Sequence, residues 1–392
     1  MNDMQRGVLA LIKCAITDED VTLPEGFDLE EALPEILRYR MGTFVYTGAV
    51  KCGMSAQAPA MKRLFLSNYQ YLIRSEKQMR DVQRIFRAFD EANIDYLPMK
   101  GCRMKELYPN PELRLMGDAD ILIREEQYDK IELIISGMGF VSDVSDEHVY
   151  TWRSEGLILE LHTHLLPPDH KDFSEYFQTG WQLAVCKEGT RYQFVRPEEE
   201  FAFLFTHFAK HYRLGGIGCR HVVDLWLYKR MHSDMDEAYL EERLGRMHLL
   251  EFYRNIMTFI RAWFEDGPID ERSEFISEYI FSSGNWGTAK TSVIGYATKS
   301  LQTKRMSKFY KLRRFLEIAF TDRKTLQRRY PVLEKWPILL PVFWVVRIVV
   351  AVFSRRKNIK ILWDSYKYSN LDRVETFQQA LDYVGLGFHY KY

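Results

Sequence analysis

Two aspartates stand two positions apart at the head of an apolar run. The stretch RLMGDADILI, residues 114–123, places Asp118 and Asp120 in front of a sequence that is otherwise typical of a buried strand. Side chains at alternate strand positions point to the same face, about 6.6 to 6.8 Å apart along the backbone. Two carboxylates held in this way repel each other and lose hydration. The spacing therefore predicts a bound cation at the start of this strand.

A third carboxylate lies in a similar setting further along the chain. Glu160 is in the middle of LILELHTHLL, where Leu159 and Leu161 would point to the opposite face. If the two strands are neighbours, Asp118, Asp120 and Glu160 converge on one sheet face. Three such ligands suit Mg²⁺ or Mn²⁺, and two ions could organise phosphoryl or nucleotidyl transfer. The alternative is a solvated strand end, against which the acid inside an apolar strand argues.

Further polar side chains surround these acids in the sequence. His162 shares the face of Glu160 in a regular strand, where it would orient that carboxylate or bind metal directly. Upstream, Lys100 and Gly101 end one strand and open a helix, which is a geometry that brings free N–H groups and a positive charge to a phosphate. Arg114 would face a triphosphate or neutralise the acids. An ordinary strand-to-helix turn is the alternative for Lys100 and Gly101.

The pattern of apolar residues predicts an α+β fold. Residues 1–92 carry helical spacing throughout, whereas residues 93–170 read as strand, helix, strand, helix and then an antiparallel hairpin. Helical spacing returns over 171–300, and we expect that region to complete an active-site cleft. Residues 301–392 form a basic, aromatic C-terminal helical region. The prediction is a small mixed β-sheet core between helical regions.

Composition narrows the class of protein. The 392 residues, with 46% hydrophobic and 28% charged side chains, favour a globular chain of two or three folding units. The 5 cysteines are widely spaced without a Cys-x-x-Cys pair, so we expect no disulfide partner. No secretory layout is apparent at the N-terminus, which predicts a cytoplasmic location. Walker loops, Rossmann glycines and zinc-protease motifs are lacking.

The charge of the chain is unevenly distributed although its net value is +0. Residues 299–360 hold 17 Lys and Arg against 3 acidic residues, which favours an anionic partner such as nucleic acid or a membrane surface. A solvated basic helix face is the alternative. Within this region, residues 336–353 are nearly all apolar, and we expect a buried core helix there, with peripheral membrane contact as the second possibility.

These residues carry a resemblance to a known family. The run LPMKGCRMKELYPNPELRLMGDADILI, followed by GMGF and LELHTHLL, resembles the uncharacterised nucleotidyltransferase family of the DNA polymerase β-like superfamily. The likeness covers residues 94–166 well and extends more loosely through the histidine-containing helices. That superfamily has a glycine-containing turn, an Asp-x-Asp or Asp-x-Glu strand and a later acidic strand residue. Here the turn reads Gly101-Cys102 instead of Gly-Ser or Gly-Gly, and its spacing to Asp118 is longer.

The resemblance implies roles for individual side chains. Asp118 and Asp120 would bind the metal ions, and Glu160 would be the third ligand and help to deprotonate an acceptor hydroxyl. The nucleotide side would be lined by Lys100, Gly101, Arg114, Gly117 and His211. His211 precedes a helix that packs beside the active site in this family. Arg220 and Asp224 of that helix would contact the substrates or form a salt bridge with each other.

The function that we predict is a Mg²⁺-dependent nucleotidyltransferase. It would transfer an NMP group from an NTP to an acceptor and release pyrophosphate. The acceptor would be RNA such as tRNA, a small molecule or a peptide. The alternative is a catalytically inactive scaffold of the same fold that contacts a partner or membrane surface through its basic C-terminal region. The retained acid triad argues against that alternative.

Overall fold

The chain divides into two compact units in the computed structural model. The first comprises residues 1–210 and 217–285, and the second comprises residues 211–216 and 286–392. The four sequence regions proposed above stay a prediction. The structure describes residues 1–17, 19–143, 148–167, 170–283, 294–295, 298, 320, 323, 326, 330, 332–346 and 371–388.

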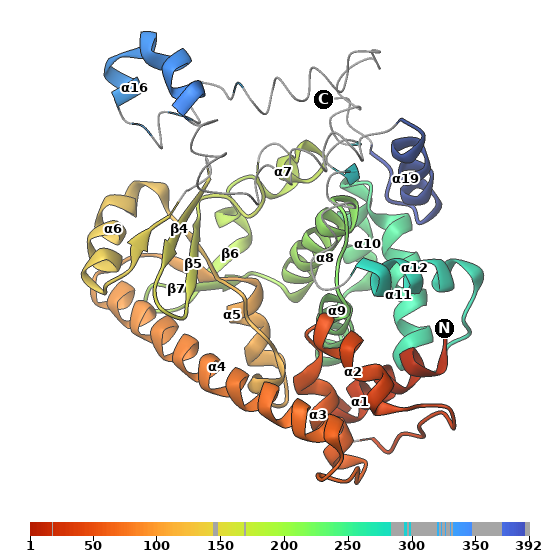
Figure 1. Cartoon of the computed structure of the whole chain (residues 1–392). Coiled ribbons are helices and arrows are strands. Elements are labelled where there is room, and N and C mark those ends of the chain that lie inside the picture. The colour runs from red at the N-terminus through yellow and green to blue at the C-terminus, as the bar shows by residue number, and fades with distance from the viewer. Residues whose placement is uncertain are drawn as a thin grey trace. The chain divides into compact units, whose positions relative to one another are not determined.

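A mixed sheet of seven strands lies in the first unit, with the order β3-β4-β5-β2-β1-β7-β6. Four of these strands, β4 to β7, are labelled in Figure 1. Strand β2 pairs in parallel with β5 and antiparallel with β1, and β4 and β5 form an antiparallel pair. The strands are β1 (Tyr96–Pro98), β2 (Ala119–Ile123), β3 (Val141–Ser142), β4 (Val149–Arg153), β5 (Ile158–His162), β6 (Ala184–Glu188) and β7 (Arg191–Phe194).

One face of the sheet is covered by two helices, α4 (Pro59–Glu91) and α6 (Tyr128–Gly137). Buried side chains from both helices join the inward side chains of β2 and β5 in one hydrophobic core. These are Val82, Ile85 and Phe89 of α4, Ile131 and Ile135 of α6, Ala119, Ile121 and Ile123 of β2, and Leu159 and Leu161 of β5. Because strand side chains alternate, the residues between these positions point to the opposite face.

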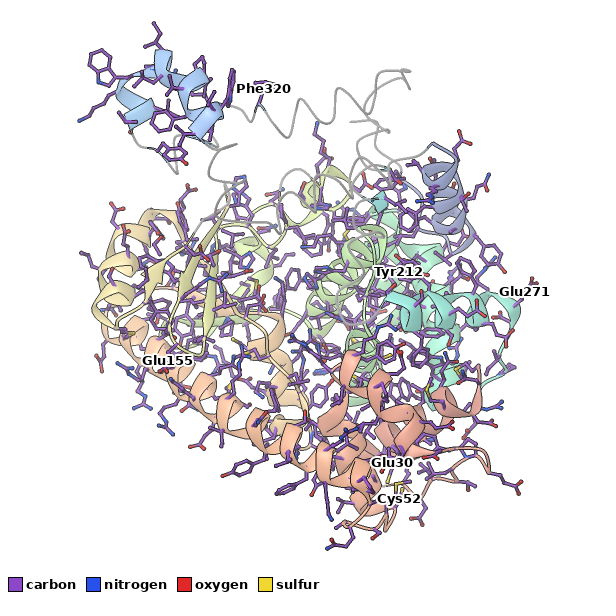
Figure 2. The ribbon with its side chains drawn as sticks, viewed as in Figure 1. Glu30, Cys52, Glu155, Tyr212, Glu271 and Phe320 are labelled. Carbon is purple, nitrogen blue, oxygen red and sulfur yellow. The ribbon has the colours of Figure 1, made fainter. Side chains whose placement is uncertain are left out.

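Helix α4 also contacts the edge of the β4–β5 hairpin. Figure 2 shows Glu155 in this turn beside α4, and its carboxylate accepts a hydrogen bond of 2.8 Å from Lys77 Nζ. Gln78, which is fully buried, donates from Nε2 to the carbonyl oxygen of Gly156 at 2.9 Å. The long helix is therefore joined to the hairpin turn by a hydrogen bond from a buried side chain, with an exposed ion pair beside it.

Further helices of the first unit precede and follow the sheet strands. The α-helices are α1 (Asp3–Thr17), α2 (Leu29–Arg38), α3 (Gly42–Lys51), α5 (Lys100–Met104), α7 (Lys171–Phe177), α8 (Pro197–Arg213, whose last turn belongs to the second unit), α9 (Cys219–Met231), α10 (Glu237–Arg246), α11 (Leu250–Phe264) and α12 (Glu271–Ser283). Short 3₁₀ helices are η1 (Lys105–Leu107), η2 (Pro111–Leu113), η3 (Glu125–Gln127) and η4 (Trp181–Leu183).

The second unit contains α16 (Val332–Lys335), η5 (Pro337–Leu339) and α19 (Leu371–Tyr383). Arg213 donates to the carbonyl oxygen of Gly387 at 2.8 Å, which ties the end of α8 to the segment after α19. In the described part of the apolar segment, residues 336–346, several large side chains are exposed. These are Trp336, Ile338, Val342 and Val345. The expected buried core helix is therefore wrong for these residues, and residues 347–353 lie outside the described part.

The α+β class and the mixed sheet are confirmed, as is the antiparallel hairpin β4–β5. The hairpin β6–β7 was not predicted, because AVCKE and RYQF are short and lie within a region of helical spacing. Gly189, with a φ of 55°, forms the turn between these two strands. None of the helices in the described ranges is long and apolar enough to cross a bilayer.

Candidate functional site

The register of the two parallel strands brings the predicted acids together. Asp120 of β2 is the direct partner of Glu160 of β5, and Leu122 is the partner of His162. Because Ile121 and Leu161 point into the core under α4 and α6, Asp120, Glu160 and His162 lie on the opposite face. We call Lys100, Asp118, Asp120, Glu160 and His162 the Asp120 cluster.

Asp120 is the most buried member of this cluster, and its Oδ1 receives two contacts. Lys100 Nζ lies 2.5 Å from this oxygen, and His162 Nε2 lies 2.9 Å from it. The same imidazole nitrogen is 3.6 Å from Glu160 Oε2. The side chain of Asp120 is 3% exposed whereas that of Glu160 is 29% exposed. Glu160 is therefore much more accessible to solvent than Asp120.

The two neighbouring aspartates have pKa values that are shifted in opposite directions. Burial and the negative charge of Asp120 raise the pKa of Asp118 to about 6. Burial alone would also raise the pKa of Asp120, but the Lys100 ammonium and the hydrogen bond to His162 hold it well below its usual range. A pair of carboxyl groups whose pKa values are pushed apart is typical of sites that handle protons and cations.

Lys100 projects from a tightly packed turn. Its backbone φ is 41°, in the left-handed region that residues other than glycine rarely adopt. At Gly101 a Cβ would lie 3.0 Å from Met116 Cγ, so glycine permits the close approach of this turn to the chain that enters β2. The thiol of Cys102 is buried in the hydrophobic core.

Arg114, in the loop that leads to β2, belongs to a second buried ionic cluster. Its Nε and Nη2 donate to the two carboxylate oxygens of Asp224 at 3.0 and 2.8 Å, and Tyr108 Oη donates to the same carboxylate at 2.7 Å. Burial alone would lower the pKa of Arg114, but Asp224 raises it above its usual value. We call Tyr108, Arg114 and Asp224 the Asp224 cluster. It joins the loop before β2 to helix α9.

The loop that leads to Asp118 is held by several further hydrogen bonds. Arg114 Nη1 and Arg220 Nη1 both donate to the carbonyl oxygen of Leu115, at 2.6 and 3.0 Å. Lys105, which is almost fully buried, donates from Nζ to the carbonyl oxygens of Pro111 and Arg114 at 2.8 and 2.9 Å. Fixed in this way, the loop presents Asp118 beside Asp120 without support from a strand partner of its own.

The donor set fits a divalent cation. Asp120, Glu160 and His162 each offer one ligand atom, and these three atoms lie within 4.8 Å of one another. Carboxylate oxygens are ligands that Mg²⁺ and Mn²⁺ prefer, and the imidazole adds a softer nitrogen donor. Asp118 lies close enough for its pKa to respond to the charges of Asp120, Lys100 and Glu160. Direct binding of the metal by Asp118 stays a prediction.

The residues predicted to line the nucleotide side lie in different parts of the structure. Gly117 lies in the bend just before β2, and Lys100 and Gly101 open α5 beside it. The side chain of Arg114 is engaged by Asp224, a pairing that the sequence did not indicate. His211 belongs to the second unit, so its predicted role stays a prediction. The sequence predicted that His162 would orient Glu160 or bind metal, from its position two residues after Glu160. It did not predict the contact of His162 with Asp120.

Comparisons with known proteins give one match. The model of a family described as uncharacterised nucleotidyltransferase matches residues 25–265. This range contains the whole sheet and both buried ionic clusters. The chain matches no curated protein and no solved structure.

Proposed function

Because the chain belongs to the uncharacterised nucleotidyltransferase family, we propose that it is a Mg²⁺-dependent enzyme that transfers an NMP group from an NTP to an acceptor. The observation that carries this proposal is the direct pairing of Asp120 with Glu160 on adjacent parallel strands. This pairing places two carboxylates and the His162 imidazole on one face, with a lysine among them. Binding of an NTP and of a divalent metal follows from the same proposal.

In the proposed reaction, an acceptor oxygen bonds to the α-phosphorus while the bond from that phosphorus to the bridging oxygen of the β-phosphate breaks, and pyrophosphate leaves. A cation held by Asp120, Glu160 and His162 would neutralise charge on the phosphates in the transition state. Glu160, which is more exposed than Asp120, would take the proton of the acceptor hydroxyl. Asp118 would help to hold the cation from the end of the loop.

We also propose which residues contact the nucleotide. Lys100 and Gly101 at the head of α5, with Gly117 across the turn, stay our proposed triphosphate contacts. Arg114 is engaged by Asp224 and Leu115, so we assign it the role of holding the loop. RNA, a small molecule and a peptide all stay open as acceptors, and a cytoplasmic location stays part of the proposal.

Label transfer tests the proposed function. The protein is incubated with each of the four α-³²P-labelled NTPs, Mg²⁺ and, in turn, total RNA, a small-molecule extract or a peptide pool. We expect label to reach one acceptor class in the presence of Mg²⁺ and not with Asp120→Asn. Absence of transfer to all three classes, together with retention of the protein on anionic liposomes, would favour the inactive scaffold.

A further inference from the structure

Lys100 occupies the position in the Asp120 cluster where a cation is expected. Its Nζ is 2.5 Å from Asp120 Oδ1, the same oxygen that His162 Nε2 contacts at 2.9 Å. We propose that Lys100 is a built-in counter-cation: a divalent metal displaces its ammonium from Asp120, and the released ammonium then binds the triphosphate. This inference rests on the proposed function, because it concerns the metal and nucleotide of that reaction.

The charges of the cluster support an exchange of cations. Asp118, Asp120 and Glu160 all act on Lys100 electrostatically. The Lys100 ammonium meets these acids at Asp120 Oδ1, 2.5 Å away, and we expect it to leave this oxygen when another cation takes its place. A divalent ion brings one more positive charge to the same acids, which lie close together.

The backbone around Lys100 allows the side chain to move while the turn stays fixed. The N–H of Met99 donates to the carbonyl oxygen of Asp120 at 3.0 Å, and Gly101 is packed against Met116. Lysine carries its charge at the end of a flexible four-carbon chain, so it can change partners by rotation of side-chain bonds alone. The 15% exposure of this side chain opens it toward solvent, from which a triphosphate would arrive.

A second buried lysine shows what a purely structural role looks like in this fold. Lys105 donates from Nζ to three neutral oxygens, those of Ser75, Pro111 and Arg114, at 2.8 to 2.9 Å. All three of its protons are used, and none goes to a candidate metal ligand. Lys100, in contrast, is bound by a carboxylate whose neighbours Glu160 and His162 are arranged as metal ligands. The two lysines therefore have different tasks.

Exchange of cations makes metal and triphosphate binding cooperative. Without a triphosphate, an incoming metal takes Asp120 from the Lys100 ammonium and nothing replaces that contact, so the metal binds weakly. With a triphosphate present, the released ammonium gains new oxygens, and both ligands bind more tightly. The part of this coupling that comes from Lys100 is lost when position 100 has no charge.

The test is Mn²⁺ binding to the full chain, measured from the electron paramagnetic resonance signal of free Mn²⁺. Mn²⁺ is titrated alone and with inorganic tripolyphosphate, and binding that persists in Asp120→Asn is subtracted. We expect Lys100→Met to bind Mn²⁺ alone about tenfold or more tightly than the unmodified protein, since a competing unit charge has been removed. Tripolyphosphate should tighten Mn²⁺ binding more in the unmodified protein than in Lys100→Met.

Two further variants make the result specific. Lys100→Arg keeps the charge and should retain the weak binding of Mn²⁺ alone. Lys187→Met removes an exposed lysine of β6 and should behave as the unmodified protein. Circular dichroism verifies the fold, and Lys100→Gln replaces Lys100→Met if the latter is unfolded.

The inference and the proposed function fail in different ways. If Mn²⁺ binding depends on Asp120 but neither uncharged variant of Lys100 binds Mn²⁺ more tightly, the exchange of cations is overturned and the metal site stands. If no Mn²⁺ binding depends on Asp120 in any variant, with or without tripolyphosphate, the metal site itself is overturned and the proposed function with it.

Discussion

Two buried ionic clusters lie close together along the loop before β2, and they are built differently. In the Asp224 cluster, one guanidinium meets one carboxylate through two hydrogen bonds of 3.0 and 2.8 Å, and Tyr108 supplies a third donor. In the Asp120 cluster, three carboxylates share one ammonium and one imidazole. The first arrangement balances its charges and satisfies its acceptors, whereas the second has an excess of negative charge.

This difference separates a structural ion pair from a site that needs a ligand. Taking charges out of water is tolerated when the partners match in number and geometry, as they do around Asp224. An excess of buried carboxylates is costly until a cation arrives. We therefore expect substitutions in the Asp120 cluster to change binding and turnover, and substitutions in the Asp224 cluster to change stability.

The largest effect is expected for Asp120→Asn. Removal of this charge takes away a proposed metal ligand and the partner of Lys100, so the rate of pyrophosphate release should fall by about a thousandfold or more. The matched control is Asp129→Asn, an exposed aspartate of α6 that should leave the rate unchanged. A rate for Asp120→Asn within threefold (roughly the ordinary scatter of a surface substitution) of the unmodified protein would remove the site from the reaction.

Arg114→Met tests the other side of the comparison. It leaves Asp224 buried without its ion-pair partner, and the free energy of unfolding in urea should fall by about 3 to 5 kcal/mol. The double variant Arg114→Met/Asp224→Leu should lose less than the sum of the two single variants, because no charge is then left alone. An additive loss would show that the two side chains do not act as a pair.

Asp118→Asn should stabilise the metal-free protein while weakening its metal binding. The pKa of Asp118 is raised to about 6 in the fold, from 3.8, so the folded state binds more protons between these values and its stability falls as the pH rises through this window. Above pH 6 the full cost is present, and its removal should add up to about 3 kcal/mol. Urea unfolding at pH 4 and pH 7.5 measures the difference in the free energy of unfolding between Asp118→Asn and the unmodified protein. This difference should be small at pH 4.

The smallest effect is expected for the surface pair of Lys77 and Glu155. Both side chains are largely exposed, at 46% and 93%, so water and salt screen their attraction. Lys77→Gln should therefore leave the free energy of unfolding unchanged within the error of the measurement. A clear loss of stability would mean that this exposed ion pair stabilises the protein, and that burial does not decide which ion pairs contribute to stability.

The sequence predicted the Asp120 cluster better than the Asp224 cluster for a physical reason. Alternation along a strand is local, so Asp120 and Glu160 could be assigned to one face once their strands were taken as neighbours. The pairing of Arg114 with Asp224 joins residues 110 positions apart through a loop and a helix, and no local pattern encodes it. As the alternative to a substrate contact, the sequence indicated a salt bridge between Arg220 and Asp224, because these residues lie four positions apart on one helix.

The fold shows the same limit. Long helices such as α4 and the apolar strands β2 and β5 were predicted from periodicity, which is strong where one face is buried. The hairpin β6–β7 lies at the edge of the sheet and exposes most of β6, so its hydrophobic alternation is weak. The glycine turn at Gly189 was the remaining signal for it.

Equilibrium dialysis with each of the four labelled NTPs tests the central claim most directly. The unmodified protein, Asp120→Asn and Asp129→Asn are compared with and without Mg²⁺. We expect at least one NTP to be retained only with Mg²⁺, by the unmodified protein and by Asp129→Asn, and to be lost from Asp120→Asn. Retention that is the same without Mg²⁺ or in Asp120→Asn, or no retention of any NTP, would contradict the assignment of the Asp120 cluster as a metal-dependent nucleotide site.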